Sequence, residues 1–176
     1  MKKYPILYIT EEMISAAEKL VDVVKVNRTI ASKIDTLTGI LGEFIFAQYF
    51  HGDWKSHRVG LNKGDVDFKD IEIKTSAYPF NENLNLLVRE DYAEKRKPRF
   101  YVQIIIDIQN KKAEEIVSGT KVYIAGWASS EEVDNAPRKD FGSKFGGRGG
   151  YFCRYIGLKY LHNMENFKKA YHRSNI

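Results

Sequence analysis

The sequence predicts a mixed α/β domain in which a central β-sheet is flanked by helices. Residues 11–25 and 34–50 have apolar side chains at helical spacing, whereas residues 100–108 are almost continuously apolar and β-branched. A continuous run of this kind is typical of a central strand that is covered on both faces. The other expected elements are short strands at 66–68, 71–75, 84–88 and 121–127, a short helix from Ser130 and a terminal helix at 164–171.

Each of the two long helices has local signals. Thr10 is a suitable N-cap for the first helix, and Glu11 and Glu12 follow in the turn where the helix dipole favours acids. The second helix contains Gly39 and Gly42, each of which costs about 1 kcal/mol relative to alanine in a helix interior. These glycines therefore predict a close approach to another backbone, expected to be the sheet.

Composition sets the broad class of protein. The chain of 176 residues fits a single domain over 1–176, and 43% hydrophobic with 29% charged residues is ordinary for a globular protein. No apolar run reaches the roughly 18 residues that a membrane span needs, so no membrane association is expected. Cys153 is the single cysteine, which excludes an internal disulfide and favours a reducing, cytoplasmic compartment.

The positive charge is concentrated at the C-terminal end. Residues 136–176 contain nine Lys or Arg and two acids, whereas residues 1–135 contain 19 bases and 21 acids. A localised basic segment is typical of a protein that binds a polyanion, although a solvated basic tail would look the same.

A charged hairpin is predicted at residues 65–74. If Lys69 and Asp70 form a two-residue link, Phe68 lies opposite Ile71. Because side chains alternate along a strand, one face then presents Asp65, Asp67, Glu72 and Lys74. The other face presents Val66, Phe68, Ile71 and Ile73, which are suited to a core.

The opposed acids of this hairpin require an explanation. Asp67 and Glu72 would have β-carbons about 4.5–5.5 Å apart, which is unfavourable for like charges. A bound divalent cation would relieve the repulsion, and hard oxygen ligands suit Mg²⁺. The alternative is an ordinary exposed hairpin face whose acids pair with nearby lysines.

The pattern of Asp67 followed by Glu72-Ile73-Lys74 resembles the PD-(D/E)XK nuclease superfamily, whose members have the restriction-endonuclease-like fold. The resemblance covers residues 34–127 and includes the helix that contains Gly42 and Glu43. The proline of the family motif is absent, so either Asp65 or Asp67 takes the aspartate position. We favour Asp67 because it lies opposite Glu72.

The resemblance implies catalytic roles for Asp67, Glu72 and Lys74. Asp67, Glu72 and the Ile73 carbonyl would hold Mg²⁺, with Mn²⁺ as a substitute, and Asp65 is the alternative ligand. Glu43 would support the same site directly or through water, unless it is an ion-paired surface residue. Lys74 would orient the attacking water and stabilise the transition state.

A basic, glycine-rich loop is expected at about 138–151. It combines cations with Phe and Tyr, which suit phosphates and exposed bases respectively. We expect its cations to contact DNA, although a surface loop without a partner would have the same composition. These cations are Arg138, Lys139, Lys144 and Arg148.

The sequence thus predicts a Mg²⁺-dependent DNA endonuclease from a phage, a mobile element or a restriction system. The first alternative is a nucleic-acid-binding protein that has the nuclease fold without activity, and the second is an unrelated α/β protein with a charged hairpin. RNA is an alternative substrate, and a homodimer is an alternative to a monomer because nucleases of this fold often pair.

Overall fold

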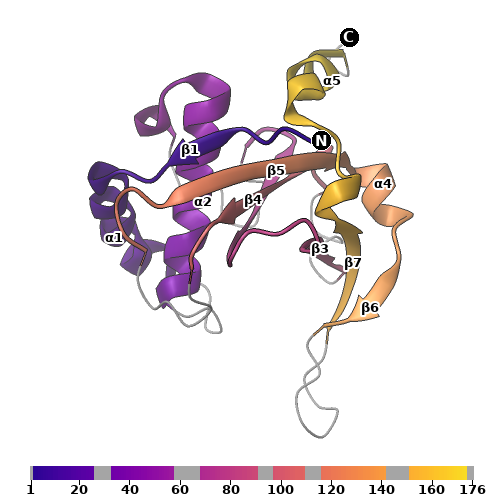
Figure 1. Ribbon diagram of the computed structural model, residues 1–176, viewed down its shortest axis with the longest axis horizontal. Helices are drawn as coiled ribbons and strands as arrows, with labels where there is room; N and C mark the ends of the chain where they lie inside the picture. Colours follow the sequence, from indigo (N-terminus) through magenta and orange to yellow (C-terminus); the bar gives the residue numbers. More distant parts are fainter. Residues whose placement is uncertain are drawn as a thin grey trace, which may run out of the picture.

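The computed structural model describes residues 2–25, 33–57, 68–90, 97–109, 116–141 and 151–173 (Figure 1). Helices in these ranges are α1 (Glu11–Lys25), α2 (Lys33–His51), α4 (Ser130–Asp134) and α5 (Phe167–Arg173). Short 3₁₀ turns are η1 (Trp54–Ser56), η2 (Leu158–Tyr160) and η3 (Met164–Asn166). The long helices α1 and α2 match the sequence prediction, and the Thr10 hydroxyl caps α1 by accepting from the Met13 N–H at 3.2 Å.

The strands form two sheets. The first is a mixed, open sheet in the order β1 (Ile6–Tyr8), β5 (Lys121–Ser129), β4 (Phe100–Ile106) and β2 (Ile71–Ala77). Within it β2 and β4 are parallel, whereas β5 is antiparallel to both β4 and β1. The second sheet is antiparallel, in the order β3 (Asn85–Arg89), β7 (Phe152–Gly157) and β6 (Arg138–Asp140).

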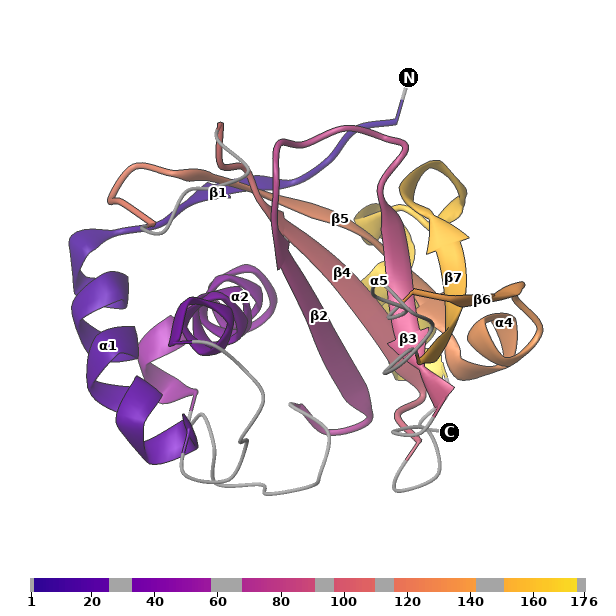
Figure 2. The ribbon, with the colours of Figure 1, turned by 90° about the horizontal axis from the view of Figure 1, so that it is seen from below.

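The first sheet lies between two layers. Figure 2 shows α1 and α2 on one side of β2, β4 and β5, and the second sheet with α4 on the other side. A large hydrophobic cluster between α2 and the sheet contains Phe46, Ile73 and Val102, and a smaller one beneath the second sheet contains Leu86 and Tyr101. Every residue of β4 is buried, which confirms the prediction of a central strand covered on both faces.

The second sheet differs from the sequence prediction. Residues 138–140 were expected at the start of a loop, but they form strand β6, which pairs with Phe152–Gly157. All three side chains of β6 are exposed, so the strand has no buried apolar position that would reveal it in the sequence. Charged residues suit such an edge strand because they oppose pairing with another chain.

The two glycines of α2 have different surroundings. A Cβ on Gly42 would lie 1.8 Å from the Thr75 hydroxyl oxygen, so the helix contacts β2 at this point, as predicted. A Cβ on Gly39 would meet nothing within 4 Å, so the predicted close approach is wrong there.

This difference predicts opposite effects of the same substitution. Gly42→Ala should lower the free energy of unfolding by about 1–3 kcal/mol, because the new methyl group would displace Thr75 from α2. Gly39→Ala should raise it by up to about 1 kcal/mol, because alanine is the better helix former. Urea denaturation measures both values, and a shift of equal sign in the two variants would contradict this packing.

Candidate active site

The predicted turn before β2 is present. Phe68 and Ile71 exchange two backbone hydrogen bonds of 3.0 Å, so Lys69 and Asp70 form a two-residue link. Asp70 has a φ of 61°, a left-handed conformation that aspartate tolerates better than most residues. Its carbonyl accepts from the backbone N–H groups of Arg99 and Phe100, which ties the turn to the start of β4. The register of β2 relative to the turn is therefore the predicted one.

Glu72 and Lys74 extend from the same face of β2. Their side chains are 24% and 29% exposed, and the Lys74 Nζ lies 3.1 Å from the Glu72 Oε1. Ile71 and Ile73 are buried on the opposite face, against α2. The alternation predicted for this strand is confirmed. A carboxylate and an ammonium group thus lie side by side on the partly exposed face of β2, two and four residues beyond Asp70.

The neighbouring strand β4 contributes polar side chains beside Glu72 and Lys74. Tyr101 lies beside Glu72 and Gln103 beside Lys74 in the parallel register. Gln103 is 1% exposed, and its amide donates to the Ile104 carbonyl at 3.0 Å and to the Ser76 hydroxyl at 3.4 Å. Burial, together with the charge of Glu72, raises the pKa of Tyr101 to about 12. Tyr101 therefore remains a neutral phenol beside Glu72 at physiological pH.

Glu43 lies on the α2 side of β2 and has a partner that the sequence did not indicate. The His57 Nε2 lies 2.8 Å from the Glu43 Oε2, and the two side chains are 11% and 16% exposed. His57 also stacks on Phe68, with ring centroids 4.2 Å apart and planes 13° apart. The sequence alone favours a structural or surface role for His57, because no histidine in the chain has zinc-type spacing. The structure instead places it between Glu43 and the hairpin.

The carboxylates near β2 lie on its two sides. Glu43 lies on the α2 side and Glu72 on the opposite face, and both offer the hard oxygen ligands that Mg²⁺ prefers. Asp65 and Asp67 fall outside the described residues, so their opposition to Lys74 and Glu72 stays a prediction. Within the ranges described above, no group of three or more His, Cys, Asp or Glu side chains is placed to hold a metal. A complete ligand set would therefore require Asp65 or Asp67.

The basic segment is only partly described. Arg138 is ion-paired with Glu90 at 2.6 Å, and its guanidinium lies 4.7 Å from the centre of the Phe152 ring. Lys139, on the same strand as Arg138, has its Nζ 5.6 Å from the centre of the Phe141 ring. Both cations thus belong to strand β6 and not to a loop. Lys144 and Arg148 are beyond the part of the chain that the structure describes.

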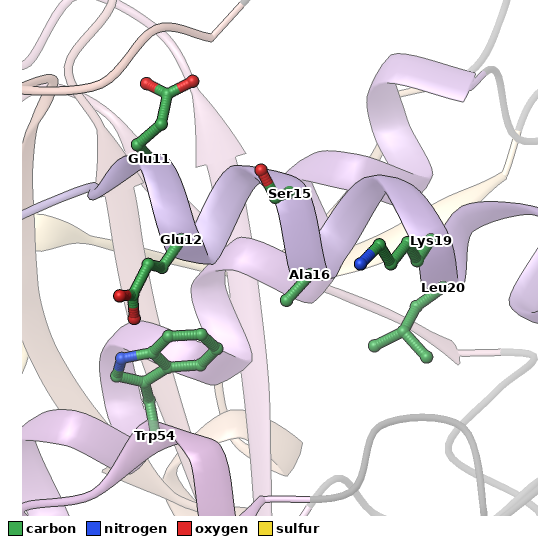
Figure 3. A pocket seen from close by; sticks show the side chains of 7 residues that line it. All are labelled: Glu11, Glu12, Ser15, Ala16, Lys19, Leu20 and Trp54. Atoms are coloured by element: carbon green, nitrogen blue, oxygen red, sulfur yellow. The ribbon is translucent and has the colours of Figure 1, made fainter.

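One hollow among the described residues lies away from the hairpin. It has a volume of about 580 Å³ and lies between α1 and η1, where the Trp54 ring faces the side of α1 (Figure 3). Its lining consists of Glu11, Glu12, Ser15, Ala16, Lys19, Leu20 and Trp54. None of the predicted site residues contributes to it.

Comparison of the chain with models of protein families, with curated proteins and with solved structures gave no match. In the described part of the chain, no helix is both long enough and apolar enough to cross a membrane.

Proposed function

We propose that this protein is a Mg²⁺-dependent endonuclease that hydrolyses phosphodiester bonds in DNA, and that its core is restriction-endonuclease-like. The observation that supports this most is the arrangement of Glu72 and Lys74. The two side chains lie 3.1 Å apart on the partly exposed face of β2, just after a tight link. Glu72 and Lys74, the two motif residues that the structure describes, therefore lie together and are partly accessible to solvent.

The order of elements also supports the proposal. Helix α2 precedes the hairpin link, β2 runs parallel to β4, and β5 returns antiparallel to β4. This is the segment over which the sequence resembles the superfamily. We propose that residues 1–176 form one nuclease domain.

In this proposal each residue has a distinct chemical role. Glu72, Asp67 and the Ile73 carbonyl would hold Mg²⁺, with Asp65 as the alternative to Asp67 and Glu43 as a supporting carboxylate. When bound, the ion supplies a water of lowered pKa and neutralises charge on the phosphate. Lys74 donates a hydrogen bond that orients the attacking water. It also stabilises the negative charge that grows on the phosphate oxygens while the bond to the leaving oxygen breaks.

Arg138, Lys139, Lys144 and Arg148 are the residues we propose to contact the DNA backbone. Strand β6, with Arg138 and Lys139, belongs to the second sheet, on the side of the first sheet away from α2 (Figure 2). Glu72 and Lys74 also extend from β2 away from α2, since Ile71 and Ile73 pack toward that helix. Neutralisation of phosphates by such residues makes binding weaken as the salt concentration rises.

Supercoiled plasmid incubated with the protein and Mg²⁺ tests this function. We expect relaxed and linear products with Mg²⁺ and none when a chelator is present. Retarded plasmid without cleavage would instead favour a nucleic-acid-binding protein that lacks activity. The absence of both binding and cleavage would contradict the proposal, and a parallel reaction with RNA identifies the preferred substrate.

A further inference from the structure

The second sheet has one face against the first sheet and one face turned away from it. Leu86 and Val88 of β3 are buried in the hydrophobic cluster that contains Tyr101 of the first sheet. Because side chains alternate along a strand, Leu87 and Arg89 project from the other side, and Leu87 is 36% exposed. We call this side the outer face of the second sheet.

Pairing between strands extends the outer face across β7. Residues directly opposite each other in an antiparallel sheet project from the same face. Tyr155 lies opposite Leu87 and therefore belongs to the outer face. Cys153 lies opposite Arg89 and belongs to it for the same reason. Tyr151 projects from this face as well, because it lies two residues before Cys153.

Strand β6 completes the outer face. Lys139 lies opposite Cys153. The Phe141 N–H donates to the Tyr151 carbonyl at 3.0 Å, so the pairing continues past the end of β6. Phe141 therefore projects on the same side as Lys139, and the Lys139 Nζ lies 5.6 Å from the centre of the Phe141 ring.

Three aromatic rings lie together over the end of the outer face nearest β6. The Phe141 and Tyr155 rings meet edge to face, with centroids 5.8 Å apart. The Tyr151 ring centre lies 4.3 Å from the Arg89 guanidinium carbon, and Tyr151 is 36% exposed. Cys153, which lies among these side chains, is only 1% exposed. The rings thus cover the middle of the sheet and present their own surface to solvent.

A fourth ring lies at the far end of β7. Gly157 is opposite Asn85 and therefore has an outer-face position. A Cβ on Gly157 would lie 3.3 Å from the Tyr160 ring, so this ring lies over the outer face. Tyr160 is 72% exposed, and the Lys159 Nζ lies 5.0 Å from its ring centre. Residues 151–157 span about 20 Å in an extended strand. The four rings therefore form a row along β7, the aromatic row, which consists of Phe141, Tyr151, Tyr155 and Tyr160.

The charges beside the aromatic row are positive. Arg89, Lys139 and Lys159 each lie beside one of its rings. No acidic residue has an outer-face position on the described strands, because Asp140 alternates with Lys139 and Glu90 with Arg89. Phosphates complement such a surface. An apolar protein surface does not, because it would remove these cations from water without a counter-charge.

We infer that the outer face of the second sheet binds single-stranded DNA, with unpaired bases stacked on the aromatic row and phosphates beside the cations. Stacking of this kind tolerates any base sequence but requires a free base face, which bases inside a duplex do not offer. The inference rests on the proposed function for the choice of DNA as the ligand. It adds that the substrate has an unpaired strand.

Tyr160 and Tyr8 provide a matched pair of substitutions. Both are exposed tyrosines, at 72% and 56%, but Tyr8 lies on β1 of the first sheet. Replacement by leucine keeps an apolar side chain and removes the ring. Tyr160→Trp restores a ring at the same position, and Tyr151→Leu tests the opposite end of the aromatic row. Urea denaturation checks that each variant is folded.

The measurement is the fluorescence anisotropy of a labelled single-stranded oligonucleotide and of its blunt duplex, with a chelator present so that neither is cut. We expect the wild-type protein to bind the single strand more tightly than the duplex. Tyr160→Leu and Tyr151→Leu should each weaken single-strand binding about 5-fold or more and change duplex binding about 2-fold or less. Tyr8→Leu and Tyr160→Trp should retain the wild-type affinity for the single strand.

Three results would overturn the inference. The first is wild-type affinity for the single strand in Tyr160→Leu and Tyr151→Leu. The second is an equal loss of single-strand and duplex binding in Tyr160→Leu, which would show that no unpaired base stacks on the ring. The third is displacement of the single strand by polyglutamate as readily as by unlabelled DNA, which would show that the face recognises negative charge alone. Should Tyr151→Leu fail to fold, the highly exposed Tyr160 decides the matter.

The anisotropy assay and the plasmid assay can fail independently. If the wild-type protein cuts plasmid with Mg²⁺ but Tyr160→Leu binds the single strand as the wild type does, only the role of the outer face is wrong. If Tyr160→Leu loses single-strand binding as expected but the wild-type protein cuts no DNA with Mg²⁺, the nuclease activity is wrong and the single-strand site stands.

Discussion

Replacing Lys74 by alanine should slow Mg²⁺-dependent DNA cleavage by about 100-fold or more. The Lys74 ammonium reaches solvent beside the Glu72 carboxylate, 3.1 Å away, and no other described residue of β2 contributes a cation. Removing it would take away the ammonium donor that we propose for the charge that develops on the phosphate. The rate of plasmid relaxation under enzyme excess measures the effect, because it isolates cleavage from product release.

Lys97→Ala is the matched control for this substitution. Lys97 also forms an ion pair, with its Nζ 2.8 Å from the Asp134 Oδ2, and its side chain is 52% exposed. Both variants lose one positive charge and one ion pair, so general weakening of DNA binding should affect them alike. Equal cleavage rates in the two variants would show that Lys74 has no special role.

Phe46→Ala should lower the free energy of unfolding by about 3–5 kcal/mol. Phe46 is fully buried, and its ring lies 5.3, 4.9 and 6.0 Å from the rings of Phe50, Phe68 and Phe167. The side chain joins α2 to the hairpin and to α5, and three rigid neighbours cannot all collapse into the space it would leave. Urea denaturation measures the loss.

Phe152→Ala provides the comparison for Phe46→Ala. Phe152 is 50% exposed at the start of β7, so the same truncation removes less buried surface there. We expect a change well below that of Phe46→Ala. A loss of equal size at the two positions would contradict the placement of the main core between α2 and the first sheet.

The first sheet and its helices could be predicted because their residues follow strong local patterns. Helix α1 begins after a capping threonine, and β4 is an unbroken apolar run. Strand β1 of the first sheet and strand β6 of the second sheet could not be predicted in the same way. Strand β1 has three residues, and β6 consists of Arg138, Lys139 and Asp140, whose strand conformation comes from pairing with β7. Such pairing depends on residues distant in the chain, which a local pattern does not report.

The candidate site was likewise predictable only in part. Alternation along a strand was enough to place Glu72 and Lys74 on one face, and a two-residue link set the register. The partnership of Glu43 with His57 joins residues 14 apart and depends on how η1 turns back toward α2. The sequence also could not show that Gly42 contacts β2 whereas Gly39 does not, because both glycines lie in the same apolar run.

The most direct test of the proposed metal-dependent nuclease activity is a comparison of wild-type protein with Glu72→Gln in the plasmid assay. Glutamine has nearly the same shape as glutamate, and the Glu72 side chain is 24% exposed, so the variant should unfold at the wild-type urea concentration. We predict relaxation and linearisation by the wild-type protein with Mg²⁺ and intact supercoiled plasmid with an equal amount of identically purified Glu72→Gln. Cleavage by Glu72→Gln at the wild-type rate would contradict the assignment of the active site to this hairpin.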